Sequence, residues 1–242
     1  MSQAPAVRRF TLEQAHAGSG FAKSFEVYEA APAEPPRGGV VVIQEIFGVN
    51  SHVRSVCQQY ARAGYLAWAP AVFDHVEKGV ELGYDQDGFM AGVELAGKVG
   101  LDIPLADVRL CAERFSELGL KTCVVGYCWG GSVAYLAAAK IGRSAFAAAS
   151  CYYGSQVPKM KMDPARCPTV LHFGERDTYI DVADVKAFQA MRPETTVHLY
   201  PANHGFNCTD RADYDEASAR LAFKRTLDLF NESVGWTGRA KA

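Results

Sequence analysis

The stretch of sequence that decides the fold is GYCWGG at residues 126–131, which joins two apolar runs. Residues 122–125 (TCVV) have the composition of a buried strand, and residues 132–141 (SVAYLAAAKI) have that of a helix. Cys128 is therefore predicted to occupy a sharp strand-to-helix turn. Side chains two positions away on either side would collide there, and both of those positions are glycine. Free N–H groups and the positive end of the helix dipole would face Cys128 and favour its thiolate.

The same stretch has a second interpretation, a glycine-rich phosphate loop that contains a buried cysteine. It lacks the Lys-Ser/Thr pair of a P-loop, and its glycines do not follow the G-x-G-x-x-G spacing of a dinucleotide-binding turn. The strand–turn–helix context instead matches the G-x-S-x-G nucleophile turn, with cysteine in place of serine. We therefore predict that Cys128 is a nucleophile and that the other six cysteines fill the core.

The rest of the chain alternates between strand-like and helix-like patterns. Short runs rich in β-branched and aromatic residues predict strands at 25–28, 40–43, 66–68, 122–125, 147–152, 169–173 and 197–200. Helical spacing of apolar residues predicts helices at 51–64, 102–119, 132–141, 182–191 and 213–233. This alternation predicts a single α/β domain over residues 1–242, with a mostly parallel sheet and helices on both faces. Residues 73–101 are the least regular and are expected to line or cover a site.

Composition excludes several classes of protein. The chain has 242 residues, 49% hydrophobic and 21% charged, and a formal net charge of -2, which argues against nucleic-acid binding. No run reaches the roughly 20 apolar residues of a membrane helix, and the first ten residues lack the apolar core of a signal peptide. Seven cysteines without a C-x-x-C pair fit neither a disulfide framework nor a zinc ribbon. We expect a cytoplasmic protein without metal or cofactor, which binds neither nucleic acid nor membrane.

A nucleophile at such a turn needs a base, and the base needs an acid that orients it. Where this turn carries a catalytic triad, the nucleophile, acid and histidine follow in that order, the last two on loops at strand ends. Asp177 follows a predicted strand and is the first candidate for the acid, with Asp181 and Glu175 as alternatives. His204 follows the next strand, whereas the other histidines precede the turn or lie inside strands. The sequence thus predicts a triad of Cys128, His204 and Asp177.

An oxyanion hole is expected beside this triad. In such proteins it combines the amide after the nucleophile with one from the loop after an earlier strand. The first would be the N–H of Trp129, and the second, from the loop at residues 44–50 (QEIFGVN), the N–H of Ile46. Glu45 in the same loop would lie near the thiol and could tune its protonation.

Four segments resemble the dienelactone hydrolase family, the carboxymethylenebutenolidase-like, cysteine-using branch of the α/β-hydrolases. They are QEIFGVN at 44–50, GYCWGG at 126–131, GERD at 174–177 and HGF at 204–206, and the resemblance extends over nearly the whole chain. It implies the α/β-hydrolase fold without a large lid domain, and a monomer that cleaves an enol-lactone or related ester without cofactor. It also implies that Glu45 interacts with the nucleophile and helps to control its ionisation.

One departure from the family pattern concerns the substrate. Members that cleave dienelactones hold the substrate carboxylate with two arginines. One belongs to the region matching residues 76–87, but this chain has no arginine from 63 to 108. The other follows the catalytic histidine by four residues, a position occupied here by Cys208. Lys78, Lys98 and Arg211 are the cations that could compensate, although a single lysine does not reproduce a bidentate clamp.

These observations predict a carboxylic ester hydrolase that acts on a small ester or enol-lactone. Cys128 would form a thioacyl-enzyme, and His204 would activate the water that hydrolyses it. Two alternatives stay open at this stage: a general carboxylesterase of another substrate, and a non-catalytic member of the fold that binds a ligand.

Overall fold

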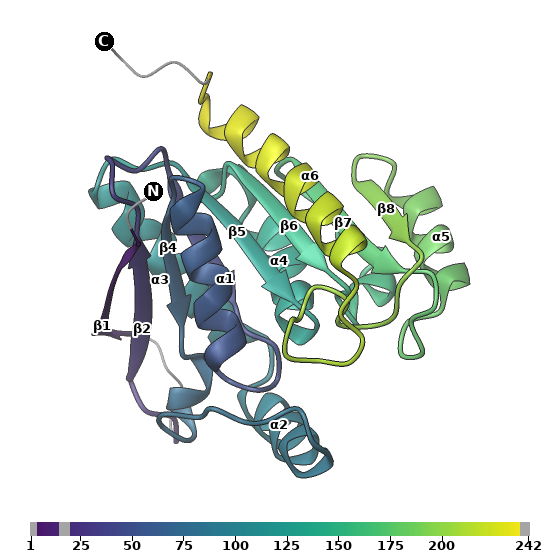
Figure 1. The fold of residues 1–242 in the computed structure, drawn as a ribbon, viewed down its shortest axis with the longest axis horizontal. Helices are drawn as coiled ribbons and strands as arrows, with labels where there is room; N and C mark the ends of the chain where they lie inside the picture. The colour runs from purple at the N-terminus through teal and green to yellow at the C-terminus, as the bar shows by residue number, and fades with distance from the viewer. Residues whose placement is uncertain (1–3, 15–19, 238–242) are drawn as a thin grey trace.

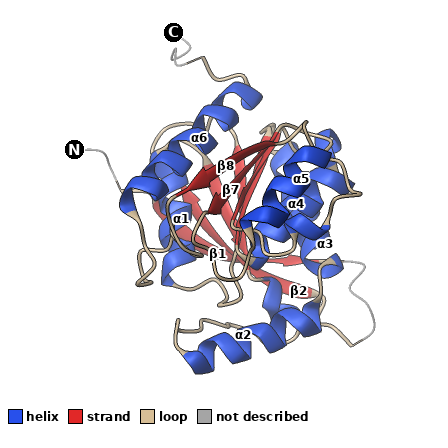
Figure 2. Cartoon of the chain, turned by 90° about the vertical axis from the view of Figure 1, so that its right-hand side faces the viewer, coloured by secondary structure: helices blue, strands red, loops and turns tan. Residues whose placement is uncertain are grey.

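The fold is built on one sheet of eight strands, seen from two directions in Figures 1 and 2. The computed structural model describes residues 4–14 and 20–237. The strands are β1 (Ala6–Glu13), β2 (Ser24–Ala31), β3 (Gly39–Ile43), β4 (Leu66–Pro70), β5 (Thr122–Tyr127), β6 (Ala148–Tyr152), β7 (Thr169–Gly174) and β8 (Thr196–Tyr200). The α-helices are α1 (Ser51–Arg62), α2 (Gln86–Val99), α3 (Asp102–Glu117), α4 (Trp129–Lys140), α5 (Val182–Met191) and α6 (Glu216–Val234). Short 3₁₀ helices are η1 (Val72–His75), η2 (Gly142–Ser144) and η3 (Val157–Lys159).

The sheet is mostly parallel, as predicted. Its strand order is β1-β2-β4-β3-β5-β6-β7-β8, and the pairs from β4 through β8 are all parallel. Only β1 with β2 and β2 with β4 are antiparallel. The central strands β3 and β5 are buried along their whole length, because helices cover both faces.

Two layers of helices enclose the sheet. Helices α1 and α6 pack on one face, and α3 and α4 pack on the other with α5 beside them (Figure 2). Helix α2 lies apart from these layers, below the ends of the strands in Figure 1. The predicted architecture of a mostly parallel sheet between two helical layers is therefore confirmed. No helix among the described residues is both long enough and apolar enough to cross a membrane.

The structure differs from the sequence prediction in four places. Strand β1 was not expected, and α2 lies within the segment expected to be irregular. Helix α4 begins at Trp129 rather than at 132, so the helix starts directly after Cys128. Helix α6 begins at Glu216 rather than at 213, because the side chain of Asp215 accepts a hydrogen bond from the Ser218 N–H and caps the helix there.

Candidate active site

The strand-to-helix turn between β5 and α4 holds Cys128 in a backbone conformation that cysteine rarely adopts. Its φ is 55°, in the region that favours glycine, and its N–H donates to the carbonyl of Tyr152 at the end of the neighbouring strand. A β-carbon at Gly126 would lie 1.9 Å from the carbonyl oxygen of Gly130, and one at Gly130 would lie 2.2 Å from that of Gln44. The glycines therefore allow β5, α4 and the loop after β3 to meet.

Cys128 differs from the other cysteines in its exposure. It is partly exposed, whereas the other six cysteines are buried. Burial raises the pKa of the Cys57, Cys111, Cys123 and Cys151 thiols well above the ordinary range, which keeps them protonated. These thiols behave as small apolar side chains.

His204 and Asp177 lie beside Cys128 in one line of hydrogen-bonding groups. The distance from His204 Nε2 to Cys128 Sγ is 3.1 Å, and that from His204 Nδ1 to Asp177 Oδ2 is 2.7 Å. The Asp177 side chain is fully buried, and its other oxygen accepts the N–H groups of Tyr179 and Ile180 at 2.8 and 3.0 Å. The acid is thereby fixed from both sides, and it orients the imidazole toward the thiol.

The two alternative acids lie elsewhere. The carboxylate of Asp181 caps α5 by accepting the Ala183 N–H at 2.8 Å. Glu175 is exposed. Asp177 is therefore the carboxylate that contacts His204.

Electrostatics favour a charged histidine in this arrangement. Burial alone would lower the pKa of His204, but the Cys128 thiolate and the Asp177 carboxylate outweigh it and raise the pKa to about 10. At neutral pH His204 is therefore an imidazolium, and its Nε2 lies 3.1 Å from the Cys128 sulfur. Such a pair supplies a nucleophile and a proton donor within one hydrogen bond of each other.

Ile46 and Trp129, the residues predicted to supply the oxyanion-hole amides, line one cavity together with Cys128 and His204. Trp129 is the first residue of α4, where backbone N–H groups have no acceptor within the helix. Ile46 lies in the loop after β3, and a β-carbon at Gly92 in α2 would come within 2.2 Å of its carbonyl oxygen. Close backbone packing of α2 thus holds this loop in place.

Glu45, next to Ile46 in the loop after β3, is completely buried. Its Oε2 accepts the hydroxyl of Tyr84 at 3.2 Å, and that hydroxyl in turn accepts an N–H from Asn50 at 3.2 Å. Its Oε1 has no hydrogen-bond partner among the described residues. The hydrogen bond thus joins Glu45 to Tyr84, while the Cys128 thiol faces His204. Any influence of Glu45 on the nucleophile acts in this arrangement through its charge.

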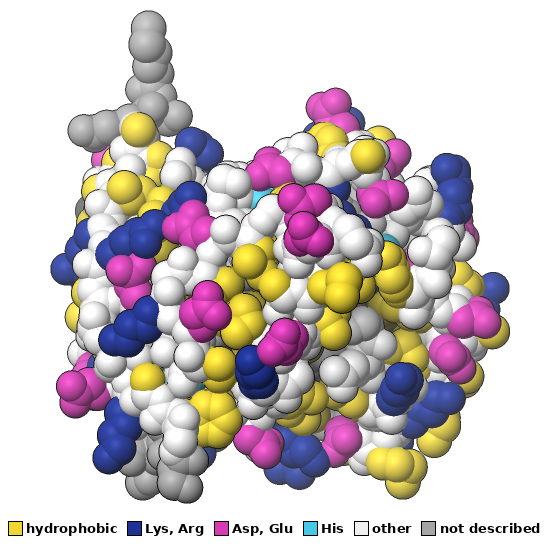
Figure 3. Space-filling model, turned by 90° about the horizontal axis from the view of Figure 1, so that it is seen from below, with side chains coloured by type: hydrophobic (Ala, Val, Ile, Leu, Met, Phe, Trp, Pro, Cys, Tyr) yellow, Lys and Arg dark blue, Asp and Glu magenta, His cyan; other side chains and the backbone are white. Residues whose placement is uncertain are grey.

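A cavity of about 330 Å³ opens above Cys128 and His204. Most of its lining is apolar and comes from the loop after β3, from α2 and from the loop after β7: Ile46, Phe47, Phe89, Val93, Ala96 and Tyr179. Its polar lining outside the triad comprises Ser155, Gln156 and Arg211. Figure 3 shows the molecule from below, and apolar side chains gather near the middle of this face.

Of the three cations named from the sequence, Arg211 alone lines this cavity. Lys78 lies at a separate hollow beside β1 and β2, and Lys98 pairs with Glu94 on the exposed side of α2. The Arg211 guanidinium packs over Gly205. Burial alone would lower the pKa of Arg211, but the nearby charge of Glu45 raises the Arg211 pKa above its ordinary value. Cys208 is buried and does not line the cavity.

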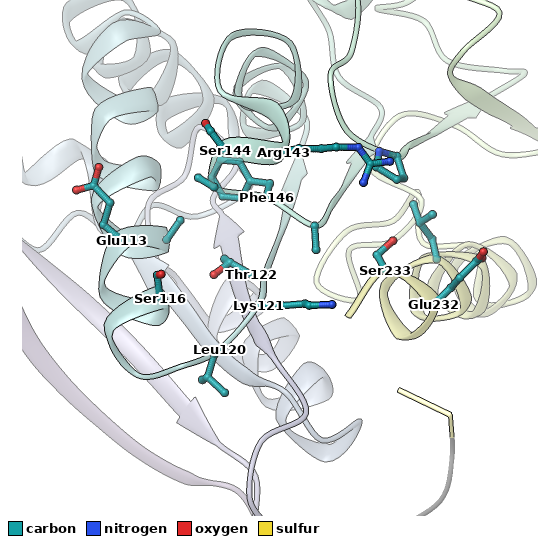
Figure 4. Close-up of a pocket in the computed structure, with 15 residues that line it drawn as sticks. Glu113, Ser116, Leu120, Lys121, Thr122, Arg143, Ser144, Phe146, Glu232 and Ser233 are labelled. Carbon is teal, nitrogen blue, oxygen red and sulfur yellow. The ribbon is translucent and has the colours of Figure 1, made fainter. Parts of the chain in front are cut away.

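Another hollow of about 690 Å³ lies at the opposite edge of the sheet. Its lining comes from the amino-terminal ends of β5, β6 and β7 and from α3 and α6 (Figure 4). Lys121 and Arg143 face it together with Glu113 and Glu232, and it contains no residue of the predicted site. Within the described ranges, no group of three histidine, cysteine or acidic side chains is placed to hold a metal ion.

A parallel sheet whose nucleophile turn, acid loop and histidine loop meet at one edge defines the class of the α/β-hydrolases. Within that class the chain belongs to the dienelactone hydrolase family, whose model matches residues 25–234. The resemblance inferred from the four sequence segments is therefore confirmed.

Three relatives illustrate the similarity. A Synechocystis protein named "Putative carboxymethylenebutenolidase" is 34% identical over 229 residues, which cover 84% of this chain and 90% of the relative. An Azospirillum brasilense protein of the same name is 31% identical and covers 88% of this chain and 95% of the relative. The crystal structure of a "Putative Dienelactone Hydrolase" from Klebsiella pneumoniae superposes with a TM-score of 0.79 at 28% identity, over 94% of this chain and 99% of the other.

Sequence reasoning missed two features of the site. Tyr84, which binds Glu45, lies in a segment without a clear pattern. The wall formed by α2 was also missed, although Asp85 caps that helix by accepting the Gly88 N–H at 2.8 Å. An Asp three residues before a glycine is a weak signal for a helix start.

Proposed function

We propose that this protein hydrolyses a small carboxylic ester or enol-lactone through a Cys128–His204–Asp177 triad. The single observation that carries the proposal is the continuous contact from Asp177 Oδ2 through the imidazole to Cys128 Sγ, at 2.7 and 3.1 Å, at the floor of a ligand-sized cavity. Membership of a hydrolase family supports the same reaction class.

The first half of the proposed reaction forms a thioester. The Cys128 thiolate attacks the carbonyl carbon, and the electron pair of the C=O bond moves to the oxygen. The N–H groups of Ile46 and Trp129 would stabilise that oxyanion. When the intermediate collapses, the bond to the leaving oxygen breaks and the His204 imidazolium gives this oxygen its proton. In a lactone the leaving group stays tethered, so its protonation also prevents reclosure.

The second half regenerates the enzyme. Neutral His204 removes a proton from water, and the resulting hydroxide attacks the thioester carbonyl. Collapse expels the Cys128 thiolate opposite the imidazolium and releases the carboxylic acid product. Asp177 keeps the Nδ1 proton of the ring in place throughout, so that Nε2 serves as acid in the first half and as base in the second.

Arg211 is the proposed contact for a carboxylate on the substrate. It is the one cation that lines the cavity among the described residues, and a guanidinium can bind a carboxylate through two N–H groups. Glu45 would balance its charge when no substrate is bound. A single arginine would bind such a substrate more weakly than two would, so neutral esters are reasonable competing substrates.

Replacement of Cys128 by alanine tests the proposed chemistry. We expect Cys128→Ala to lose turnover of lactone and of simple esters while retaining the fold by circular dichroism. Full activity in that variant would overturn the nucleophile assignment. An inactive wild-type protein whose thiol does not react with iodoacetamide would favour the non-catalytic ligand-binding alternative.

The role of Arg211 has its own test. Arg211→Gln should raise KM for a carboxylate-bearing lactone about tenfold or more, because a charged hydrogen bond is worth about 1.5–3 kcal/mol, and it should leave KM for a neutral ester nearly unchanged. Equal effects on both substrates would favour the general carboxylesterase.

A further inference from the structure

The cavity mouth carries two aromatic rings that the proposed chemistry does not use. Phe89 belongs to α2 and Tyr179 to the loop after β7, and both line the cavity above the thiol. Their ring centroids are 6.4 Å apart and their planes differ by 29°. The side chains are 37% and 63% exposed, so much of each ring is available to a ligand.

Neighbouring residues extend these rings into an apolar wall. Val93, Ala96 and Gly97 continue the lining along α2, at intervals that place them on one side of the helix. Val93 is 49% exposed, and a β-carbon at Gly97 would have no neighbour within 4 Å. This side of the cavity therefore has both the surface and the space for an apolar group.

The position of Tyr179 indicates which part of a substrate this wall receives. Its ring packs edge-on against the imidazole of His204, with 5.1 Å between ring centroids. In the proposed reaction, His204 protonates the leaving oxygen, so the leaving group must project from the imidazole. Among the residues that line the cavity, Tyr179 packs on the imidazole and Phe89 lies beside Tyr179.

We infer that Phe89 and Tyr179 bind an aromatic ring on the alcohol side of the substrate. The inference rests on the proposed function, because it uses the role of His204 to assign the side. Two nearly parallel rings select a planar π-system over an alkyl group of equal size, since aromatic pairs contribute about 0.5–1.5 kcal/mol beyond their buried area. The ligand class is thus an ester of an aryl-bearing alcohol, for which arylmethyl esters serve as probes.

Benzyl acetate and cyclohexylmethyl acetate form a matched pair of substrates. Their acyl groups are identical and their alcohols are similar in size, so apolar burial alone gives no preference for benzyl. We expect wild-type kcat/KM to be about tenfold higher for benzyl acetate, as two aromatic contacts would produce. Equal values for the two esters would overturn the inference.

Variants locate the source of this preference. Phe89→Ala and Tyr179→Ala should each lower the ratio to about threefold, because one aromatic contact remains in each variant, and Phe89→Tyr should retain the roughly tenfold ratio. The Tyr179 N–H that binds Asp177 is a backbone group and survives the replacement. Met90→Ala is the matched control, because Met90 neighbours Phe89 on α2 but points away from the cavity at 62% exposure. An unchanged ratio in both alanine variants would refute the role of the rings.

Two further measurements separate the side of binding and the chemistry. Methyl phenylacetate and methyl cyclohexylacetate carry the ring on the acyl side, and the enzyme should hydrolyse them at similar rates. If the aromatic preference appeared only with this pair, the ring would bind on the acyl side and the assignment would be overturned. Chemical-shift titration can measure the binding of benzyl alcohol and of cyclohexylmethanol to Cys128→Ala. This measurement does not depend on turnover. Tighter binding of benzyl alcohol than of cyclohexylmethanol supports the inference even if the wild-type protein hydrolyses no ester. If the wild-type protein hydrolyses esters but prefers the aromatic compound neither as substrate nor as ligand, the inference is refuted and the proposed function is not.

Discussion

Replacement of Asp177 by asparagine tests the line of contacts through His204. In the native chain, one Asp177 oxygen accepts two backbone N–H groups and the other accepts from His204 Nδ1. Asparagine has one acceptor oxygen and one NH₂ group in the same space. If its oxygen keeps the two backbone donors, the NH₂ faces Nδ1 and forces the ring proton onto Nε2. The imidazole then presents a hydrogen to Cys128 and cannot accept the thiol proton.

The size of this effect follows from the hydrogen bonds that the correct tautomer would require. To present its oxygen to Nδ1, the substituted asparagine would have to leave the N–H groups of Tyr179 and Ile180 without an acceptor, at about 1–3 kcal/mol each. The wrong tautomer is therefore favoured by about 2–6 kcal/mol, and kcat should fall about 30- to 25,000-fold. Asp177→Asn in an otherwise folded protein is thus expected to be severely impaired.

The assay is steady-state hydrolysis of an activated ester between pH 6 and 10.5, with Asp181→Asn as the matched control. Asp181 lies on the same loop but caps α5, so its replacement should change kcat less than threefold. Because Asp177 helps to raise the His204 pKa to about 10, the alkaline fall of kcat/KM should lie near pH 10 in wild type and move to lower pH in Asp177→Asn. Asp177→Asn with more than a tenth of wild-type kcat and an unchanged pH profile would refute the reasoning.

Three further predictions concern stability. Gly126→Ala should lower the free energy of unfolding in urea by about 3 kcal/mol or more, because the new β-carbon would lie 1.9 Å from the Gly130 carbonyl oxygen. A change below about 1 kcal/mol would contradict this packing. Gly97→Ala has open space in α2 and should stabilise by about 0.5–1 kcal/mol, so a loss of stability would show that the helix end is not as described. Burial lowers the pKa of His172, so below about pH 6.5 the ring takes up a proton only in the unfolded protein, and the protein loses stability as the pH falls. His172→Gln should reduce the slope of stability against pH between pH 5 and 6 by up to about 1.4 kcal/mol per pH unit. An unchanged slope would argue against a neutral buried ring.

The predicted triad residues come together because the sheet is regular. Cys128, Asp177 and His204 each lie within four residues of the end of a strand, and the carboxyl ends of parallel strands meet at one edge. Strand composition and chain order are local features, so sequence alone could predict this meeting. It could not separate Asp177 from Asp181, because both are acidic residues in one loop and only three-dimensional packing decides which caps the helix.

Helix α2 was missed for a physical reason. Its buried face consists of Gly88, Gly92, Leu95 and Val99, so half of the face that normally shows an apolar pattern is glycine. The glycines permit contact of α2 with the backbone of other segments, as at Gly92 and the Ile46 carbonyl. Apolar Phe89 and Val93 are instead partly exposed at the cavity. Periodicity detects burial by side chains, not close approach by backbone.

Strand β1 and the position of Arg211 depend on long-range contacts. Strand β1 is an edge strand, exposed over its first half, and its Arg8-Arg9 pair removes the alternation that predicts strands. Arg211 follows His204 by seven residues in a loop, and its side chain enters the cavity by packing over Gly205. The path of a loop is set by what it packs against, which the local sequence does not contain.

Trapping of the acyl-enzyme tests the central claim most directly. Wild-type protein mixed with an activated ester, quenched in acid within milliseconds and examined by intact-mass and peptide mass spectrometry, should carry one acyl group per chain on Cys128. Hydroxylamine should remove this group, as expected of a thioester, and Cys128→Ala should not acquire it. Turnover with the acyl group on another residue, or unimpaired turnover in Cys128→Ala, would contradict the account.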